Sequence, residues 1–445
     1  MKKQILWLAL LFLGVSFEAA VAQTTPAHAL TNITIHHADG SIDESATLVW
    51  RDGVIEAAGS NVNIPFDAFE IDGGDSLHVY PGFIDGFSVW GSPDLPTDLK
   101  PVDDPGNPPY DRAGIQPDRR PSVVLQSDKN FETGMKAGFT TAALVPKGYM
   151  LPGQVEVFYL SDDLESVELL HEQLAQSGSF EEAPGGWTRG VYPSTLMGVM
   201  AKFRQLMFDA EALQQHIKYY SQNPEMPAPD RDPVIESLFP LLNKEVPLYF
   251  EVDQKEHIER LLKLKDEFGF DVVIVSGKEA YAKADELKDR NIPVLASIDF
   301  TDMPDWYKKQ KEAEDSDEEA EEEEVSEEEQ AYRDKQMEAW KAEVTNIRKL
   351  MDAGVSVGYA SAGLELKDLA DKLEILLNEG SVSEEEAVQL MTQNTAEILG
   401  LGDRLGSLEK GKNASFSVFS KPFSEEKAKV LHSISNGTIH EFNGE

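Results

Sequence analysis

Short runs of β-branched residues alternate with helical patterns through the middle of this chain. The runs lie at 139–145, 247–252, 271–275, 292–298 and 355–359, and helical patterns at 258–268, 281–289 and 364–377 separate several of them. Strand, helix and strand at this spacing indicate βαβ units, which assemble into a parallel sheet. Their spread favours an α/β fold of the (β/α)8 TIM-like barrel type, which takes about 250 residues. An open doubly wound sheet is the alternative, but no glycine fingerprint follows the first strand to support nucleotide binding.

Both ends of the chain have a different strand texture. Residues 29–35 and 46–58 alternate between apolar and polar side chains, with a hairpin signal at Asp52-Gly53, and residues 414–419 and 430–439 do the same around Asn436-Gly437. We therefore expect one small β-sandwich module built from both ends. Its N-terminal part is predicted at 23–80 and its C-terminal part at 403–445, with the barrel at 81–402.

The first residues predict a signal peptide over residues 1–22. Lys2 and Lys3 precede an apolar run at 5–15, and the small residues at 20–22 form a cleavage site before Gln23. A buried N-terminal helix is the alternative. The expected location of the mature protein is periplasmic or secreted. The chain has no cysteine, which excludes disulfides, lipid-anchored lipoproteins and thiolate metal sites.

The formal net charge is −40, from 80 acidic and 40 basic residues. This balance argues against binding nucleic acid or an anionic membrane surface, both of which need a basic face. Residues 311–330 alone hold 13 acidic residues and one lysine, between Trp306 and Trp340. Like charges repel, so we predict a solvated insertion at 311–330, with a helix resuming near Ala331. Cation buffering or docking of a basic partner is the functional alternative.

Two motifs resemble a known family. Residues 80–89 read YPGFIDGFSV, which resembles the first barrel strand of the amidohydrolase superfamily, where a Pro-Gly turn leads into an apolar-Ile-Asp step. Residues 392–401, TQNTAEILGL, and 406–414, GSLEKGKNA, are similar to its C-terminal signature, in which a helix ends at a glycine and a tight turn starts the returning strands. The imidazolonepropionase-like branch of these metal-dependent hydrolases is the most similar.

The resemblance implies a catalytic divalent metal at the carboxyl ends of the strands. In the family, two histidines with one residue between them end the first strand, further histidines end the fifth and sixth, and an aspartate ends the eighth; the metal activates a water. The matching positions here carry other residues: Phe87, Val89, Glu251, Ser276 and Ser361. We therefore predict no metal and no cofactor, and zinc would be expected only if these assignments were wrong.

The histidines support this prediction independently, because none of the nine lies at the carboxyl end of a predicted strand. His171, His216 and His257 fall on helical stretches. Glu251 and Asp253 share one strand face and could bind a hard cation weakly. The other interpretation is a pair at the barrel rim that is hydrogen-bonded or paired with Lys278.

Some side chains are predicted to face a ligand at the barrel mouth. They are Trp90, Asp253, Lys278, Arg119 and Arg120. Arg119 and Arg120 belong to a loop that either binds a ligand or ties other loops together.

Three functions remain open at this point. The first is a non-catalytic homologue (a pseudoenzyme) that acts as a binding or scaffolding subunit, with an active amidohydrolase paralogue or a second copy of itself as partner. The second is a hydrolase of carbon–nitrogen bonds with an atypical site that uses Glu251, Asp253 or Asp85. The third is a sensor of small ligands or glycans in an apolar mouth around Phe87, Val89 and Trp90.

Overall fold

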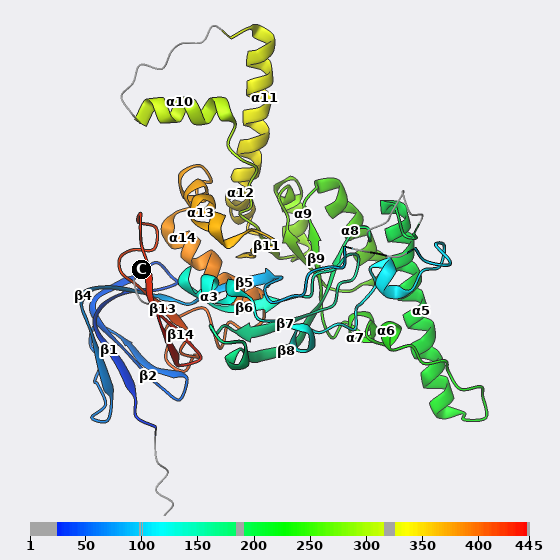
Figure 1. Cartoon of the computed structure of the whole chain (residues 1–445), viewed down its shortest axis with the longest axis horizontal. Helices are drawn as coiled ribbons and strands as arrows, with labels where there is room; N and C mark the ends of the chain where they lie inside the picture. Colours follow the sequence, from blue (N-terminus) through cyan, green and yellow to red (C-terminus); the bar gives the residue numbers. More distant parts are fainter. Residues whose placement is uncertain (1–24, 98, 100, 184–190, 316–324, 443–445) are drawn as a thin grey trace, which may run out of the picture.

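A computed structural model of the chain describes residues 25–442 except for 98, 100, 184–190 and 316–324 (Figure 1). The predicted signal peptide and the centre of the acidic segment lie outside the described residues. The described strands form two sheets, one of seven strands and one of eight. Among the described residues, no helix has the length and apolar character needed to cross a bilayer.

The two ends of the chain meet in the seven-stranded sheet, whose order is β15-β14-β13-β4-β1-β2-β3. Apolar side chains on one side of its strands, Trp50, Ile35 and Phe416 among them, form their own core. The described strands hydrogen-bond as one continuous sheet, where the sequence predicted a β-sandwich module. The strands are β1 (His28–His36), β2 (Ile42–Arg51), β3 (Val54–Gly59), β4 (Phe69–Pro81), β13 (Phe416–Phe419), β14 (Val430–Ser435) and β15 (Thr438–Glu441).

The eight-stranded sheet follows the chain order from β5 to β12. All five predicted runs lie in it, as β6, β9, β10, β11 and β12. Its strands are β5 (Phe83–Ser88), β6 (Phe139–Leu144), β7 (Gln154–Tyr159), β8 (Glu168–Ser179), β9 (Leu248–Val252), β10 (Val272–Ser276), β11 (Val294–Ala296) and β12 (Val357–Tyr359).

The first and last strands of this sheet lie side by side. The Ala362 N–H donates to the Phe87 carbonyl oxygen at 3.1 Å. A Cβ atom at Gly86 would stand 2.7 Å from the Tyr359 carbonyl oxygen, so only glycine lets the two backbones approach this closely. The described residues thus form a mixed α/β fold consistent with a TIM-like barrel beside a second, smaller sheet.

One part of the sheet departs from the predicted (β/α)8 pattern. β7 pairs antiparallel with both β6 and β8, whereas the remaining pairs are parallel. No crossover helix is needed between antiparallel neighbours, and β6, β7 and β8 follow one another through short connections. His171, expected on a helical stretch, lies on β8 with its side chain exposed.

Apolar side chains fill both sides of the eight-stranded sheet. An inner core gathers Ile84, Phe87, Tyr249, Val275 and Leu295 from strands across the whole sheet. Contributions from strands this far apart to one cluster mean that the sheet curves around it. An outer core separates the strands from helices that include α3 (Lys129–Lys136), α5 (Leu196–Gln222), α8 (Lys255–Phe268), α9 (Ala284–Asp289), α12 (Asn346–Asp352), α13 (Leu369–Asn378) and α14 (Glu384–Gln389).

Short elements complete the path of the chain. The one-turn helices are α2 (Pro121–Val124), α6 (Pro233–Glu236), α7 (Phe239–Leu242) and α15 (Thr395–Ile398), and a π-helical turn over Leu390–Asn394 joins α14 to α15. Single 3-10 turns occur at Tyr110–Ala113, Leu164–Ser166, Ala280–Lys283 and Leu366–Asp368.

The flanks of the acidic segment are helical. α10 (Asp305–Asp315) and α11 (Glu327–Val344) stand clear of the two sheets (Figure 1). α11 begins at a Ser326 cap, four residues before the predicted point, because the Ser326 hydroxyl accepts the Glu329 N–H and three glutamates favour the first turn. Near its C-terminal end, the Trp340 indole donates to the Thr301 carbonyl oxygen at 3.0 Å, which holds the helix to the loop after β11.

Candidate functional site

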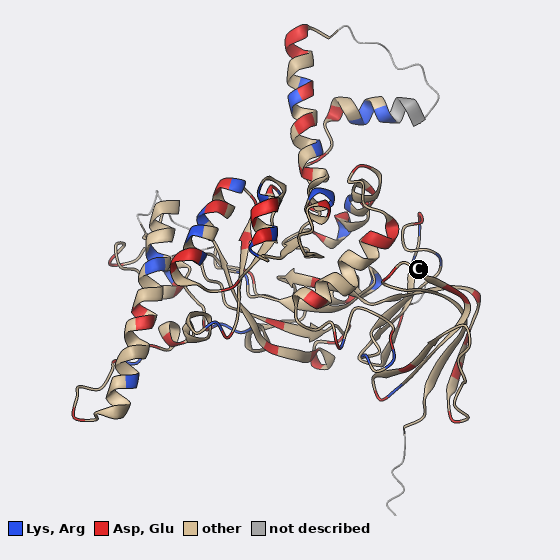
Figure 2. Cartoon of the chain, turned by 180° about the vertical axis from the view of Figure 1, so that it is seen from behind, with Lys and Arg blue, Asp and Glu red and all other residues tan. Residues whose placement is uncertain are grey.

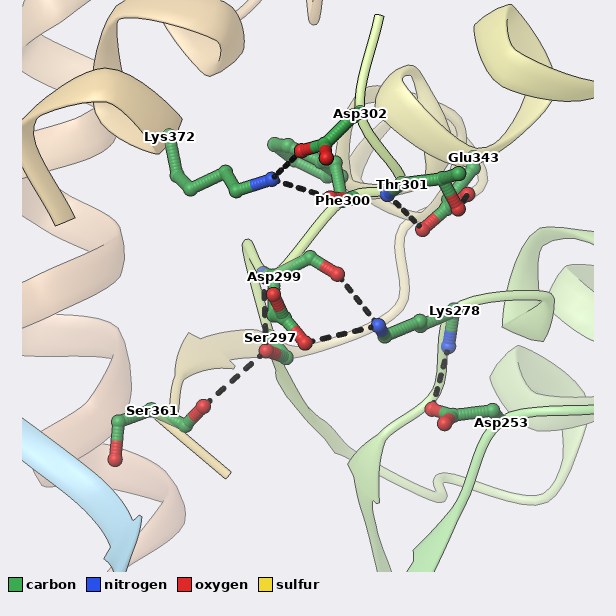
Figure 3. A network of polar contacts seen from close by, with 10 residues as sticks. All are labelled: Asp253, Lys278, Ser297, Asp299, Phe300, Thr301, Asp302, Glu343, Ser361 and Lys372. Atoms are coloured by element: carbon green, nitrogen blue, oxygen red, sulfur yellow. Dashed lines mark hydrogen bonds and ion pairs between the residues drawn. The ribbon is translucent and has the colours of Figure 1, made fainter. Parts of the chain in front are cut away.

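The carboxyl ends of β10, β11 and β12 are linked by a chain of polar contacts (Figure 3). The Lys278 ammonium donates to the Asp299 backbone oxygen at 2.5 Å and lies 3.2 Å from its carboxylate. The Asp299 N–H donates to the Ser297 hydroxyl oxygen at 3.1 Å, and that hydroxyl donates to the Ser361 carbonyl oxygen at 3.3 Å. We call the surface formed by these strand ends, together with those of β5 and β9, the strand-end face.

Lys278 does not pair as the sequence suggested. Its side chain contacts Asp299, and it reaches Asp253 only through its backbone N–H, 3.4 Å from Asp253 Oδ1. Of the two contacts that the rim-pair interpretation allowed, the described residues show the hydrogen bond from Lys278 to Asp253 and no ion pair of the Lys278 ammonium with Glu251 or Asp253.

The loop after β11 is held by two helices. Lys372 of α13 donates to the Phe300 carbonyl oxygen at 2.6 Å and lies 3.2 Å from Asp302 Oδ1. Glu343 of α11 accepts hydrogen bonds from the Thr301 N–H and hydroxyl (Figure 3). A cavity of about 960 Å³ lies between this loop and α13, and three of the four lysines that line it, Lys278, Lys372 and Lys311, contact a carboxylate.

The two first-strand positions carry no atom that can bind a metal. Phe87 is 3% exposed and belongs to the inner core, and Val89 packs half-buried against the same core. Hydrocarbon side chains offer neither a lone pair nor a charge to a cation. The phenyl ring instead occupies space on the inner side of the sheet.

Ser361, at the eighth-strand position, is joined to the first strand. Its N–H donates to Asp85 Oδ1 at 2.9 Å, and its hydroxyl lies 3.4 Å from the Phe87 carbonyl oxygen. The structure thus brings Ser361 and Phe87 together, although 274 positions separate them. In this arrangement the serine contacts backbone and Asp85.

Asp85 is completely buried below these residues. Its Oδ1 accepts the N–H groups of Ser361 and Phe87, while Oδ2 meets no hydrogen-bond donor in the described part of the chain. Burial outweighs these hydrogen bonds and raises the pKa of Asp85 to about 6. The buried Asp85 carboxyl thus links the backbone after β12 to that of β5 and has a structural role.

Glu251 lies next to Ser179 of β8 and Val275 of β10 in the sheet register. Water reaches its side chain, yet neighbouring protein atoms displace enough hydration that desolvation, followed by repulsion from Asp253 and Glu181, raises its pKa to about 7. Alternation along β9 places Glu251 on the same side as Tyr249 of the inner core. Glu251 can therefore exchange a proton near neutral pH.

Ser276, at the sixth-strand position, ends β10 in the left-handed region with φ +70° and is 3% exposed. Its carbonyl oxygen accepts the Ser297 N–H at 3.2 Å. A non-glycine residue in this region costs roughly 1–2 kcal/mol, which the surrounding strands must offset.

The donor set of these five positions does not fit a catalytic zinc ion. Phe87 and Val89 have no donor, Ser276 and Ser361 offer neutral hydroxyls, and Glu251 alone has a carboxylate. Across the described residues, no group of three or more His, Asp or Glu side chains is arranged to hold a metal ion. The chemistry that this face can perform is hydrogen bonding and proton exchange.

Two residues predicted to face a ligand have structural positions instead. Trp90 is 4% exposed, with its ring 5.9 Å from that of Phe139 in the outer core, because the chain turns at the end of β5. Arg120 pairs with Glu156, whose side chain is completely buried, at 2.9 Å. Trp90 thus packs in the outer core, and Arg120 ties its loop to β7, which was the second interpretation given for that loop. Arg119, by contrast, lines a separate cavity of about 260 Å³.

Sequence reasoning missed Ser297 and Asp299. Both follow β11, at the end of a run that the sequence did identify. A polar residue directly after a buried strand was the available signal, since parallel strands deliver such residues to one face.

Comparison with known proteins gives the following relatives. The model of the amidohydrolase family matches residues 306–440. An amidohydrolase from Thermotoga maritima MSB8 is 21% identical, with a TM-score of 0.73 over 93% of this chain and 99% of that chain. A prolidase in complex with N-methylphosphonate-L-proline is 14% identical, with a TM-score of 0.51 over 94% of this chain and 100% of that chain. A Xaa-Pro dipeptidase with bound methionine is 15% identical, with a TM-score of 0.51 and the same coverage.

No curated protein matches the sequence at a significant level. The solved structures, at identities this low, establish the shared fold, and the family model adds the sequence relationship in the C-terminal third. Residues 306–440 thus match the amidohydrolase family, and the chain as a whole has the fold of solved amidohydrolases, in agreement with the motifs at residues 80–89 and 392–414.

Proposed function

We propose that this protein is an exported, non-catalytic amidohydrolase homologue that acts as a binding or scaffolding subunit around a closed barrel. The observation that carries the proposal is the contact between Phe87 and Ser361, where the family would place two ligands of one metal. A buried phenyl ring and a hydroxyl directed to backbone stabilise the barrel junction at that point. A metal would have to displace both, with no replacement donors beside them.

The charge of the protein favours a basic partner. Carboxylates are spread over the helices and strands, α11 included, rather than confined to one face (Figure 2). A net charge of −40 repels a second copy of this chain but attracts a cationic surface through long-range electrostatics. An active paralogue with a basic face is therefore the partner that we favour over a homo-oligomer.

The proposal is tested by metal analysis of the purified mature chain together with co-purification from its native host. We expect well below one zinc, manganese or cobalt per chain, and no change in melting temperature with EDTA. We also expect no hydrolysis of dipeptides or cyclic amides after metal addition, and a hydrolase among the co-purified proteins. One tightly bound metal per chain together with turnover would overturn the proposal.

A hydrolase with an atypical site is the second candidate, and the environment of Glu251 favours it. A carboxylate with a pKa of about 7, beside Asp253 and near Lys278, has the protonation behaviour of a general base at neutral pH. In this case a carbon–nitrogen bond would be cleaved by a water that Glu251 activates without a metal. Turnover by the metal-free protein that is abolished in Glu251→Gln would favour this candidate over the first.

A further inference from the structure

A small cavity lies beside the strand-end face, over the ends of β5 and β6. Its volume is about 260 Å³, and its walls come from the loop after β5, the turn at Tyr110–Ala113 and the loop after β6. Pro93, Leu95, Pro96 and Leu99 form an apolar side, and the uncharged or basic polar groups come from Arg112, Gln116, Arg119 and Tyr149. This space is separate from the inner core around Phe87.

Arg119 is a half-buried cation whose described partners are all neutral. Its Nη1 donates to the Lys147 carbonyl oxygen at 2.9 Å and lies 3.4 Å from Gln116 Oε1. Within the described residues, neither Nε nor Nη2 has an acceptor, and no carboxylate lies within ion-pair distance. Burial lowers the pKa of Arg119, an effect that the nearby charge of Asp118 partly offsets.

Most of the described arginines of this acidic protein contact a carboxylate, and Arg119, like Arg260 and Arg404, belongs to the minority that do not. Seven of them contact at least one carboxylate: Arg51, Arg120, Arg204, Arg231, Arg290, Arg333 and Arg348. A desolvated guanidinium gains more from an anion than an exposed one does, because fewer water dipoles compete. The Nε–H and Nη2–H groups of Arg119, which have no acceptor among the described residues, can therefore donate to an anion in a partly desolvated place.

The backbone holds Arg119 in place before any ligand arrives. Its N–H donates to the Gln116 carbonyl oxygen at 3.1 Å, and its own carbonyl oxygen accepts the Gln154 N–H of β7 at 2.8 Å. Anchoring on both sides reduces the entropy that binding would cost.

Tyr149 adds a neutral donor on the same cavity. Its hydroxyl has no hydrogen-bond partner among the described residues, and burial raises its pKa, with a smaller effect from Glu181. The phenol thus stays protonated at neutral pH and can donate to an anion. The acidic groups around the cavity compete little, because Asp94 lies 2.7 Å from the Lys147 ammonium and Asp111 is exposed to water.

We propose that Arg119 and Tyr149 form a binding site for a small carboxylate whose compact aliphatic body packs against Pro93, Leu95 and Pro96. A planar guanidinium suits a planar carboxylate, which it can hold through two parallel hydrogen bonds. The apolar side and the modest volume select a short branched chain over a sugar or a nucleotide. This site goes beyond the proposed scaffolding role and does not depend on it.

Isothermal titration of the full mature chain with 4-methylpentanoate tests the site, with 4-methylpentanamide as the uncharged match. We expect the carboxylate to bind at least about tenfold more tightly than the amide, as the loss of charge-assisted hydrogen bonds would dictate. Arg119→Gln should weaken carboxylate binding by about tenfold or more, and Tyr149→Phe by a smaller factor. Arg204→Gln, which removes a paired arginine elsewhere, should leave binding unchanged.

Leu95→Trp fills the cavity without touching the charge, and it should abolish binding even if Arg119→Gln fails to fold. The proposal is overturned if the wild-type chain binds neither compound or binds both equally. It is also overturned if a folded Arg119→Gln or Leu95→Trp variant retains wild-type affinity.

Discussion

The Ser361 N–H donates a hydrogen bond to Asp85 Oδ1 at 2.9 Å and so joins the last strand of the eight-stranded sheet to the first. The carboxyl that accepts it is fully buried and has a second oxygen with no donor in the described residues. The junction therefore includes an ionisable group whose charged form the surroundings disfavour.

The stability of this junction should depend on pH through Asp85. Its folded pKa, about 6, exceeds the ordinary 3.8, so the folded protein retains a proton that the unfolded chain has released. The contribution of this group is then largest below pH 4 and is lost as the pH rises through 6. The stability of Asp85→Asn relative to the wild type should increase by about 1–2 kcal/mol between pH 5 and pH 8 in urea unfolding. A constant difference would show that Asp85 does not titrate in this way.

Phe87→Ala should destabilise the fold by about 3–5 kcal/mol, because it leaves a cavity in the inner core. Val89→Ala is the matched control, since Val89 packs against the same core but is only half-buried. It should cost about 1 kcal/mol. Thermal and urea unfolding of both variants measure the difference, and similar small losses would mean that Phe87 does not stabilise the inner core.

Removing the charge of Arg120 should leave the buried Glu156 carboxylate without its ion-pair partner. Glu156 is completely enclosed and also accepts the Ser122 N–H at 2.7 Å. Arg120→Gln should cost about 2–3 kcal/mol, below the range for fully buried pairs because the arginine is 37% exposed. The double variant with Glu156→Gln should recover most of this stability. If the double variant were as unstable as Arg120→Gln alone, the loss would not come from leaving the Glu156 carboxylate without its partner.

Glu251→Gln should change how stability depends on pH. Because its pKa is raised to about 7, the protonated form is favoured in the folded state, and stability is lost as the pH rises from about 4.5 through 7. The glutamine variant should therefore be more stable than the wild type at pH 8 and show less difference at pH 5. A two-dimensional NMR titration of the Glu251 carboxyl carbon measures its pKa directly. A pKa near the ordinary value of a glutamate would contradict this prediction.

The turn at Gly53 should be sensitive to a single added methyl group. Its φ is +75°, and a Cβ would lie 2.9 Å from the Asn436 carbonyl oxygen in the opposite hairpin turn. Gly53→Ala should cost about 2–3 kcal/mol, because conformational strain and the clash add. Gly74→Ala is the control, with φ +62° and nothing within 4 Å, and should cost only the conformational part, about 1 kcal/mol. Equal losses of stability in the two variants would show that the close contact between the two turns adds no cost.

Local pattern was sufficient for much of the fold but failed at β8. The segment Glu168–Ser179 contains leucine, glutamine and glutamate, which favour a helix in isolation. It forms a strand because β7 and β9 offer backbone hydrogen bonds on both sides, and such tertiary pairing overrides intrinsic preference. Two helices around the acidic segment were similarly underestimated, since capping by Ser326 offsets some of the charge repulsion.

The sequence by itself determined which chemistry the five family ligand positions can offer, because a side chain such as that of Phe87 has no metal donor in any conformation. It also determined the βαβ order, since strand and helix periodicities are local. Tertiary structure alone decided that Lys278 pairs with Asp299, that Glu156 pairs with Arg120, and that the described partners of Arg119 are neutral. Lys278 and Asp299 are 21 positions apart and Arg120 and Glu156 are 36 apart, so their meeting depends on how the strands between them are arranged in the sheet.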